Sequence, residues 1–336
     1  MTIGSTAHSA FRRIKPEIYR EAIVDHDALG RKLRMDSPET LGVSTEWFLV
    51  SAFLDGETGC AHDHLDYMWQ EFSHIHKTLL KGWLRLLLDH VEGAGWSSGL
   101  EDGTLLNVPG NGFWDSYYRL ADQATGACHT SIDARNELAF LTTRESLRGL
   151  LIDANDLSAH WVQDILTLVA DREGAEGVEA LIRRTYETIW KDRYSLWFSL
   201  NGHERLALSA EGMRPHFSGK FRTGDFEIEE TEESYVMVFD PCGTGGVMRR
   251  GDEVTGRPQV IPTFGRGTND AVRDWSWGQT GVSWYCSHCP MLLEWFPRQD
   301  FLRIVRPVLF HPDPYKPCRW VVPKSVDPLQ EMTSDA

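Results

Sequence analysis

The chain has 336 residues, of which 34 are Lys or Arg and 49 are Asp or Glu, so its formal net charge is -15. This acidic balance argues against a protein that binds nucleic acid or an anionic membrane surface, because both need clustered basic residues. Hydrophobic residues make up 41% and charged residues 25%, as in an ordinary globular protein with one large domain or two medium ones.

Helical periodicity dominates the N-terminal part of the chain. Apolar residues recur at steps of three and four over 61–91, which predicts a long core-facing helix that ends at Gly93-Ala94-Gly95. A stretch rich in Gly, Asn and Asp over 96–140 predicts a loop region. Helical spacing returns over 157–169 and again over 175–197.

An alternating pattern replaces the helical one after Gly202. Residues 226–229 and 234–239 alternate on either side of an acidic turn, which predicts a β-hairpin. The segments 282–285, 301–309 and 319–322 are further candidate strands.

These patterns together predict an α+β protein. A mainly helical N-terminal region (1–205) is followed by a C-terminal antiparallel β-rich domain (206–325) with a cysteine cluster, and residues 326–336 form a flexible tail. No apolar run approaches the roughly 18 residues that cross a bilayer, and the N-terminus lacks the apolar segment of a secretory signal. We predict a cytoplasmic protein with reduced thiols and no membrane partner.

Four of the six cysteines fall in the C-terminal part, at Cys242, Cys286, Cys289 and Cys318. Cys286 and Cys289 form a Cys-x-x-Cys knuckle, whose two thiolates can bind one tetrahedral ion, and two further thiolates would complete the site. We predict that the four bind a metal, with zinc preferred and iron possible. Two interpretations stay open beside it: thiol chemistry without a metal, and unrelated buried cysteines that act as small hydrophobes.

The metal hypothesis has a structural and a catalytic form. A closed site of four thiolates is structural, whereas three ligands leave a position for water or substrate. In the catalytic form His288 or Asp240, which lie close to the cysteines in sequence, acts as general acid or base.

Histidines and acids gather at the start of the long predicted helix. His62, Asp63 and His64 would face a cleft between the helical and β-rich parts, and we count His62 and Asp63 among the candidate catalytic residues. The alternative is a set of exposed or capping side chains, since acidic groups favour the positive end of a helix. Glu71 and His74 have the Glu-x-x-His spacing of carboxylate-bridged di-iron bundles, but those need a second such motif, which we do not find.

Tryptophan is dense in the C-terminal part, at Trp275, Trp277, Trp284, Trp295 and Trp320. Such large rings either fill a β core or wall a pocket for a planar or apolar ligand, and the sequence leaves both interpretations open.

The motif Tyr285-Cys286-Ser287-His288-Cys289-Pro290, followed by Pro317-Cys318-Arg319-Trp320, resembles the cysteine-rich ending of the L-2-amino-thiazoline-4-carboxylic acid hydrolase family. It is also similar to the small-molecule-binding domain of 4-vinyl reductases. The resemblance covers about the last third of the chain. It implies an α+β small-molecule domain and, as one activity, hydrolysis of a carbon–nitrogen or carbon–sulfur bond.

We therefore predict a cytoplasmic enzyme of small-molecule catabolism, a hydrolase with a cysteine-bound metal and a small-molecule substrate. Two other functions remain open at this point. One is a ligand-sensing module whose zinc is purely structural, and the other is an iron or thiol oxidoreductase.

Overall fold

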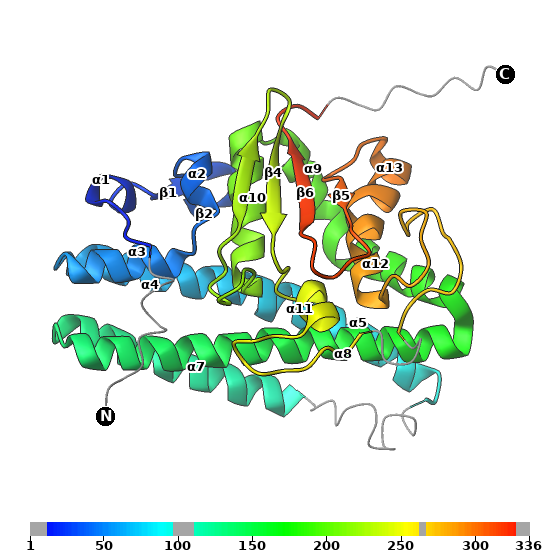
Figure 1. The fold of residues 1–336 in the computed structure, drawn as a ribbon, viewed down its shortest axis with the longest axis horizontal. Helices are drawn as coiled ribbons and strands as arrows, with labels where there is room; N and C mark the ends of the chain where they lie inside the picture. The colour runs from blue at the N-terminus through cyan, green and yellow to red at the C-terminus, as the bar shows by residue number, and fades with distance from the viewer. Residues whose placement is uncertain (1–11, 97–110, 262–266, 327–336) are drawn as a thin grey trace.

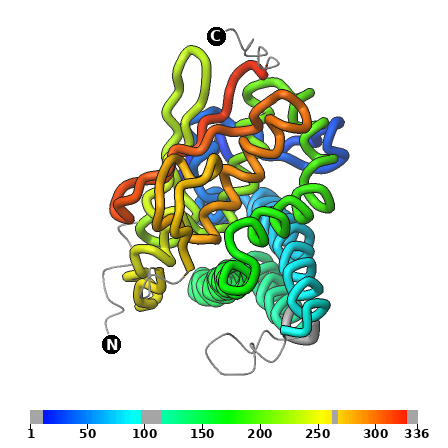
Figure 2. Tube along the Cα trace, turned by 90° about the vertical axis from the view of Figure 1, so that its right-hand side faces the viewer, coloured from blue at the N-terminus to red at the C-terminus, as the bar shows by residue number. Residues whose placement is uncertain are grey.

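The computed structural model describes residues 12–96, 111–261 and 267–326. Long helices run along one side of the molecule, and a small antiparallel sheet with shorter helices lies on the other side (Figure 1). Seen along the long axis, the long helices (cyan to green) lie below the C-terminal segments (orange and red), so the molecule has two layers (Figure 2). The predicted α+β class is confirmed.

The long helix predicted over 61–91 is confirmed as three consecutive segments. Helix α4 (Thr58–Ser73) continues into the π-helix η2 (His74–Leu80) and then into α5 (Lys81–Gly93). Its apolar stripe is buried in the main core, as the periodicity requires. The chain leaves this helix at Gly95, whose φ of 74° lies in the left-handed region that glycine adopts without strain.

Helix α7 (Asn111–Asp133) occupies part of the stretch predicted as a loop over 96–140, so the prediction is wrong for 111–133, and residues 97–110 lie outside the described part of the chain. Its buried residues do recur at steps of three and four: Tyr118, Ala121, Thr125, Cys128 and Ile132. Because two of these positions are small or polar and their neighbours are Gly, Asn and Asp, hydropathy alone hides the helical face.

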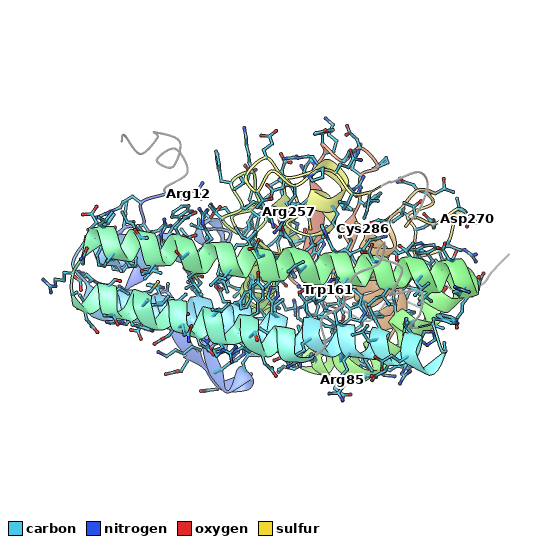
Figure 3. The ribbon with its side chains drawn as sticks, turned by 90° about the horizontal axis from the view of Figure 1, so that it is seen from below. Arg12, Arg85, Trp161, Arg257, Asp270 and Cys286 are labelled. Atoms are coloured by element: carbon cyan, nitrogen blue, oxygen red, sulfur yellow. The ribbon has the colours of Figure 1, made fainter. Side chains whose placement is uncertain are left out.

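Helix α7 lies alongside α8 (Glu137–Thr185), and the two run together along the face seen from below (Figure 3). A kink at Gly174, with φ 74° and ψ -172°, interrupts α8 where the sequence predicts a join between helices. The chain then passes through the π-helix η3 (Tyr186–Trp190) into α9 (Lys191–Ser199). Within the described ranges no helix, α8 included, is both long and apolar enough to cross a membrane.

The main sheet has the strand order β3-β4-β6-β5 and is antiparallel throughout. Strands β3 (Glu227–Glu230) and β4 (Ser234–Phe239) form the predicted hairpin, and β6 (Cys318–Pro323) contains the strand predicted over 319–322. The edge strand β5 (Val308–Leu309) has two residues, so only the end of the strand predicted over 301–309 is formed. In this register Cys318, the first residue of β6, pairs with Phe239, the last residue of β4.

The segment predicted as a strand over 282–285 instead begins the helix α12 (Trp284–Pro290). Ser283 caps this helix, because its side chain accepts a hydrogen bond from the backbone N–H of Cys286 at 3.2 Å. The cap places both cysteines of the knuckle on one short helix.

The remaining elements complete the architecture. Helix α10 (Gly202–Met213) contains the predicted boundary between residues 205 and 206, and the division into domains stays a prediction. The other elements are α1 (Pro16–Tyr19), β1 (Ile23–His26), η1 (Asp27–Leu29), β2 (Arg31–Arg34), α2 (Pro38–Leu41), α3 (Thr45–Leu54), η4 (Arg214–His216), α11 (Gly245–Arg250), the π-helix η5 (Met291–Trp295) and α13 (Phe296–Phe301).

Candidate functional site

The fold brings the four C-terminal cysteines to one small pocket of about 60 Å³, here called the cysteine pocket. Cys242 follows the end of β4, Cys286 and Cys289 project from α12, and Cys318 opens β6. Because β4 and β6 are paired, the end of one strand and the start of the other lie side by side. Residues far apart in sequence thus meet at one end of the sheet.

Two glycines allow the loop after β4 to close over the thiols. A Cβ on Gly245 would stand 2.5 Å from the sulfur of Cys286, and a Cβ on Gly246 would stand 3.1 Å from the Cβ of Cys242. The first distance is shorter than an ordinary contact, so a side chain at position 245 would displace the thiol of Cys286. The hydroxyl of Thr244 lies 3.4 Å from the sulfur of Cys242.

Burial governs the ionisation of the thiols. It raises the pKa of Cys286, and it raises the pKa of Cys289 and Cys318 well above the usual thiol range, with the neighbouring cysteines adding to the effect. The thiols of Cys286, Cys289 and Cys318 are therefore protonated at neutral pH unless a cation is present to stabilise thiolates.

Four sulfur donors suit zinc or iron by their chemistry. Over residues 12–96, 111–261 and 267–326, however, no group of three or more His, Cys, Asp or Glu side chains is arranged so that it could hold a metal ion. The cysteines share a pocket without forming a ligand set, and metal binding remains a prediction.

His288 is the predicted acid–base residue that lies in the cysteine pocket. Its Nδ1 hydrogen-bonds to the carbonyl oxygen of Tyr285, so the proton sits on Nδ1 and Nε2 carries the lone pair. Nε2 lies 3.5 Å from the sulfur of Cys289. Burial lowers the pKa of His288 to about 4, which keeps the ring neutral and able to accept a proton.

A second, larger cavity of about 640 Å³ adjoins the cysteine pocket. The two share five lining residues: Met213, His216, Tyr285, His288 and Trp320. The large cavity is of the size that holds small organic ligands. Its aromatic wall consists of Trp83, Trp190, Tyr194, Trp197, Tyr285 and Trp320. Of the tryptophans singled out in the sequence, Trp320 lines both pockets and Trp277 lines the cysteine pocket.

All three π-helical segments of the described chain border this large cavity. His74, Ile75, Leu79 and Leu80 come from η2, Ile189 and Trp190 from η3, and Leu292 and Leu293 from η5. π-Helical turns are rare, and they occur frequently at functional sites because the wider turn redirects side chains. Their convergence marks the cavity as the candidate functional site.

His216 is a cavity residue that the sequence does not reveal. It ends η4, its Nδ1 lies 3.0 Å from Oδ1 of Asn155, and burial followed by the proximity of His288 lowers its pKa to about 4. The carbonyl of His216 accepts a hydrogen bond from Nδ2 of the same asparagine at 3.3 Å. A single histidine in Arg214-Pro215-His216-Phe217 carries no motif, so only the fold identifies it.

The structure does not bring the other predicted catalytic residues to this site. His62 hydrogen-bonds to Asp133 and His129 of α7, and Asp63 lies 3.5 Å from Lys32 with its side chain 60% exposed. Asp240 accepts a hydrogen bond from Arg250 at 2.7 Å and is also exposed. None of the three lines the cysteine pocket or the large cavity. The cleft predicted beside His62 is filled by packing between α4 and α7.

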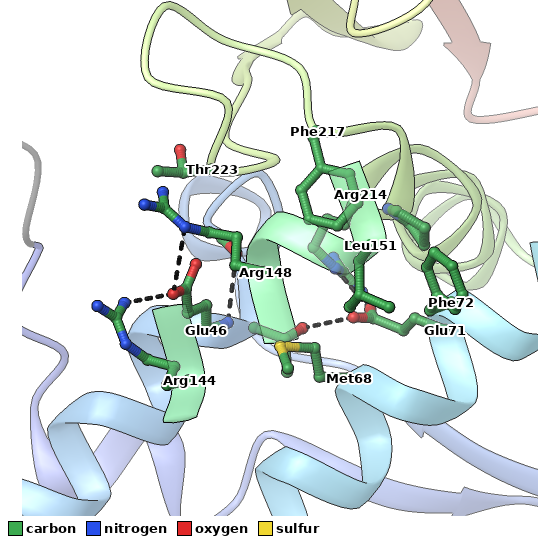
Figure 4. A pocket seen from close by; sticks show the side chains of 13 residues that line it. Glu46, Met68, Glu71, Phe72, Arg144, Arg148, Leu151, Arg214, Phe217 and Thr223 are labelled. Atoms are coloured by element: carbon green, nitrogen blue, oxygen red, sulfur yellow. Dashed lines mark hydrogen bonds and ion pairs between the residues drawn. The ribbon is translucent and has the colours of Figure 1, made fainter. Parts of the chain in front are cut away.

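Glu71 does not act with His74 as a di-iron ligand pair. Its carboxylate is buried and accepts hydrogen bonds from Thr45 at 2.8 Å and from Arg214 at 2.6 Å (Figure 4). His74 instead lines the large cavity. The two residues of the Glu-x-x-His spacing thus lie in two unrelated environments, and the π-helix η2 begins at His74.

Comparisons with family models, with curated proteins and with solved structures found no match. The resemblance of the cysteine motifs to the thiazoline carboxylic acid hydrolase family therefore stays a prediction, and the functional argument depends on the site itself.

Proposed function

We propose that this chain is an enzyme of small-molecule catabolism that hydrolyses a carbon–nitrogen or carbon–sulfur bond of a ligand held in the large cavity. One observation carries the proposal: the cysteine pocket and the large cavity share part of their walls. Two imidazoles and the thiols therefore stand at the edge of a ligand-sized apolar space. Such a combination of a mainly apolar volume with polar groups that converge on it is typical of catalytic sites.

In the reaction we propose, water supplies a hydroxyl group to the carbon, the bond from carbon to nitrogen or sulfur breaks, and the leaving atom takes the proton. His288 is the residue that moves this proton. Its Nδ1–H is fixed by the carbonyl of Tyr285, so Nε2 is free to accept a proton from water or from the Cys289 thiol. His216, held by Asn155, lines the same cavity and is the second candidate for proton transfer.

Metal binding at Cys242, Cys286, Cys289 and Cys318 is part of the proposal, with zinc as the metal and iron as the alternative. The support is the donor chemistry and the shared pocket. When bound, such an ion would supply positive charge that stabilises thiolates and polarises an oxygen next to it. All six cysteines are free in the structure, which supports the proposal that the protein works in the reducing cytoplasm.

Elemental analysis of the purified protein is the first test. About one zinc per chain supports the metal site, whereas iron would favour the oxidoreductase function. A protein without metal and with full activity would contradict the metal part of the proposal and leave the Cys289–His288 pair as the reactive group.

The second test is turnover of a panel that includes L-2-amino-thiazoline-4-carboxylic acid, detected by mass spectrometry as the gain of one water molecule. Wild type is compared with Cys289→Ser and with the control Cys128→Ser, whose thiol is buried on α7 away from the site. We expect Cys289→Ser to stay folded and lose turnover. A different outcome is that wild type turns over no substrate and that Cys289→Ser unfolds or loses metal. In that case the protein is a ligand-sensing module with a structural zinc, and the hydrolase proposal is wrong.

A further inference from the structure

Arg306 is a cationic side chain in the wall of the large cavity. It lies between α13 and β5, and its backbone N–H donates a hydrogen bond to the carbonyl of Leu293, a residue of η5. The Cζ atom of its guanidinium stands 4.9 Å from the ring centroid of Trp320 and 6.0 Å from that of Trp197. The cation is thus presented to the cavity between two indole rings.

No carboxylate in the described part of the chain pairs with this guanidinium, and its buried Nε has no hydrogen-bond partner there. The other two arginines of the cavity differ from each other. Arg31 is paired with the Glu211 carboxylate through two hydrogen bonds, the longer of them at 2.6 Å. Arg193 donates from Nε to the carbonyl of Ile189 at 2.9 Å and, unlike Arg306, has no aromatic ring beneath its guanidinium in the described part of the chain. Arg306 is half-buried, and a partly buried arginine without an acidic partner is costly for the folded protein.

Burial lowers the pKa of Arg306 to about 10, so the group is still charged at neutral pH. A fixed charge in a mainly apolar cavity fits a ligand that brings the opposite charge. The planar guanidinium pairs best with a planar anion that offers two oxygens, since both N–H groups can then donate in parallel.

We propose that the large cavity binds an apolar, ring-containing organic acid whose carboxylate pairs with Arg306 while its ring lies among the tryptophans. This inference rests on the proposed function, since it names the substrate class of the same site. The aromatic wall supplies the apolar contacts, and Arg306 sets the orientation of the ligand relative to His288 and Cys289.

The thiol of Cys289 is an alternative partner for Arg306. The guanidinium is close enough to Cys289 to lower the pKa of that thiol, although burial has the larger and opposite effect. If a metal holds the cysteines as thiolates, their negative charge could balance Arg306 instead of a ligand. Binding and metal content must therefore be measured on the same samples.

Isothermal titration calorimetry with naphthoate and with the neutral naphthamide tests the inference without any turnover. We expect wild type to bind naphthoate at least about tenfold more tightly than naphthamide, and Arg306→Gln to weaken naphthoate by about tenfold to a hundredfold with little effect on naphthamide. The matched control is Arg303→Gln, because Arg303 also lies over an aromatic ring, that of Phe198 at 5.4 Å, but does not line the cavity. This control should retain both affinities.

Arg306→Lys keeps the charge without the two-pronged geometry and should give an intermediate loss for naphthoate. Equal affinity of wild type for the two probes, or no binding of either, would overturn the inference, and neither result needs a folded Gln variant. Loss of metal from Arg306→Gln with unchanged naphthoate affinity would assign the arginine to the cysteines. Naphthoate binding through Arg306 in a protein that hydrolyses nothing would leave this inference standing while the proposed function fails.

Discussion

Two pairs of histidines in this molecule occupy opposite environments. His216 and His288 are held by the amide of Asn155 and the carbonyl of Tyr285 in the wall of the large cavity. His62 and His129 stack at 4.8 Å between α4 and α7, with their Nδ1 atoms 2.6 Å apart. Their outer nitrogens face two exposed carboxylates, of Asp133 at 2.9 Å and Asp66 at 3.0 Å.

The difference shows what makes a histidine chemically useful. The cavity pair, His216 and His288, has neutral hydrogen-bond partners and little contact with water, so each ring is neutral. One ring nitrogen can therefore accept a proton beside a ligand. The surface pair has charged partners on both sides but lines neither the cysteine pocket nor the large cavity. Hydrogen bonding alone therefore does not define a site, and a space for the ligand is needed as well.

The largest expected effect comes from a substitution that displaces the backbone next to the cavity pair, His216 and His288. A Cβ on Gly243 would stand 1.8 Å from the carbonyl oxygen of His216, and the other atoms nearest to it are also backbone atoms, which cannot rotate away as a side chain can. We expect Gly243→Ala to lower the free energy of unfolding by about 3 kcal/mol or more in denaturant titrations.

Gly59→Ala is the control on the other side of the comparison. Gly59 lies three residues before His62 on α4, and a Cβ there meets no atom within 4 Å. Alanine is the better helix former, so this variant should be neutral or more stable by up to about 1 kcal/mol. Equal destabilisation by both changes would show that the loop around Gly243 is not the rigid support described here.

The next effect concerns catalysis. If His288 moves the proton, His288→Gln should lower kcat/KM by about a hundredfold or more, since the amide can keep the contact with Tyr285 but cannot take up a proton. His129→Gln should leave kcat/KM unchanged, because His129 is a member of the surface pair. Full activity of His288→Gln would remove that residue from the mechanism.

The cysteine pocket and the surface pair also differ in how far the sequence revealed them. The Cys-x-x-Cys spacing and the strand pattern around Cys318 are local signals, and they led to four residues that do share a pocket. The motif around His62 is equally conspicuous, yet α7 covers it, and the loop prediction for that segment concealed the helix.

Residues of the large cavity could not be found in this way. His216 and Arg306 each stand alone in sequence, and they become significant only because η4, η5 and the segment before β5 meet around one space. The π-helical turns that shape this space leave no hydropathy signature, since a single extra residue per turn is lost in an ordinary helical pattern.

A smaller effect concerns the pH dependence of stability, and we expect it to arise from the titration of His76. His76 stacks on Phe72 with ring centroids 4.1 Å apart, and burial, followed by the proximity of His216, lowers its pKa from 6.5 to about 3. Below about pH 6.5 the unfolded chain binds a proton on His76 before the folded chain does. The contribution of His76 to the free energy of unfolding is therefore largest above that pH and declines toward pH 3. This histidine contributes about 1.4 kcal/mol per pH unit to the slope.

His76→Gln retains a donor for the carbonyl of Pro215 and removes the titration, so the slope of unfolding free energy against pH should fall by that amount. Phe72→Leu is the control, because it weakens the same packing without removing a titrating group. It should lower stability equally at each pH. An unchanged slope in His76→Gln would mean that the buried ring is not held neutral.

The smallest expected effect belongs to the surface pair. The side chain of Asp133 is 73% exposed, so its interaction with His62 is screened by water, and Asp133→Asn should cost less than about 1 kcal/mol of unfolding free energy. That cost should vanish in about 1 M salt, where charges act over only a few ångströms. Asp66→Asn, on the other side of the pair, should behave in the same way. A loss of several kcal/mol that persists in high salt would instead show that more than exposed charges hold the two stacked rings in place, and the surface pair would then have to be treated as a structural centre rather than as the inert counterpart of the cavity.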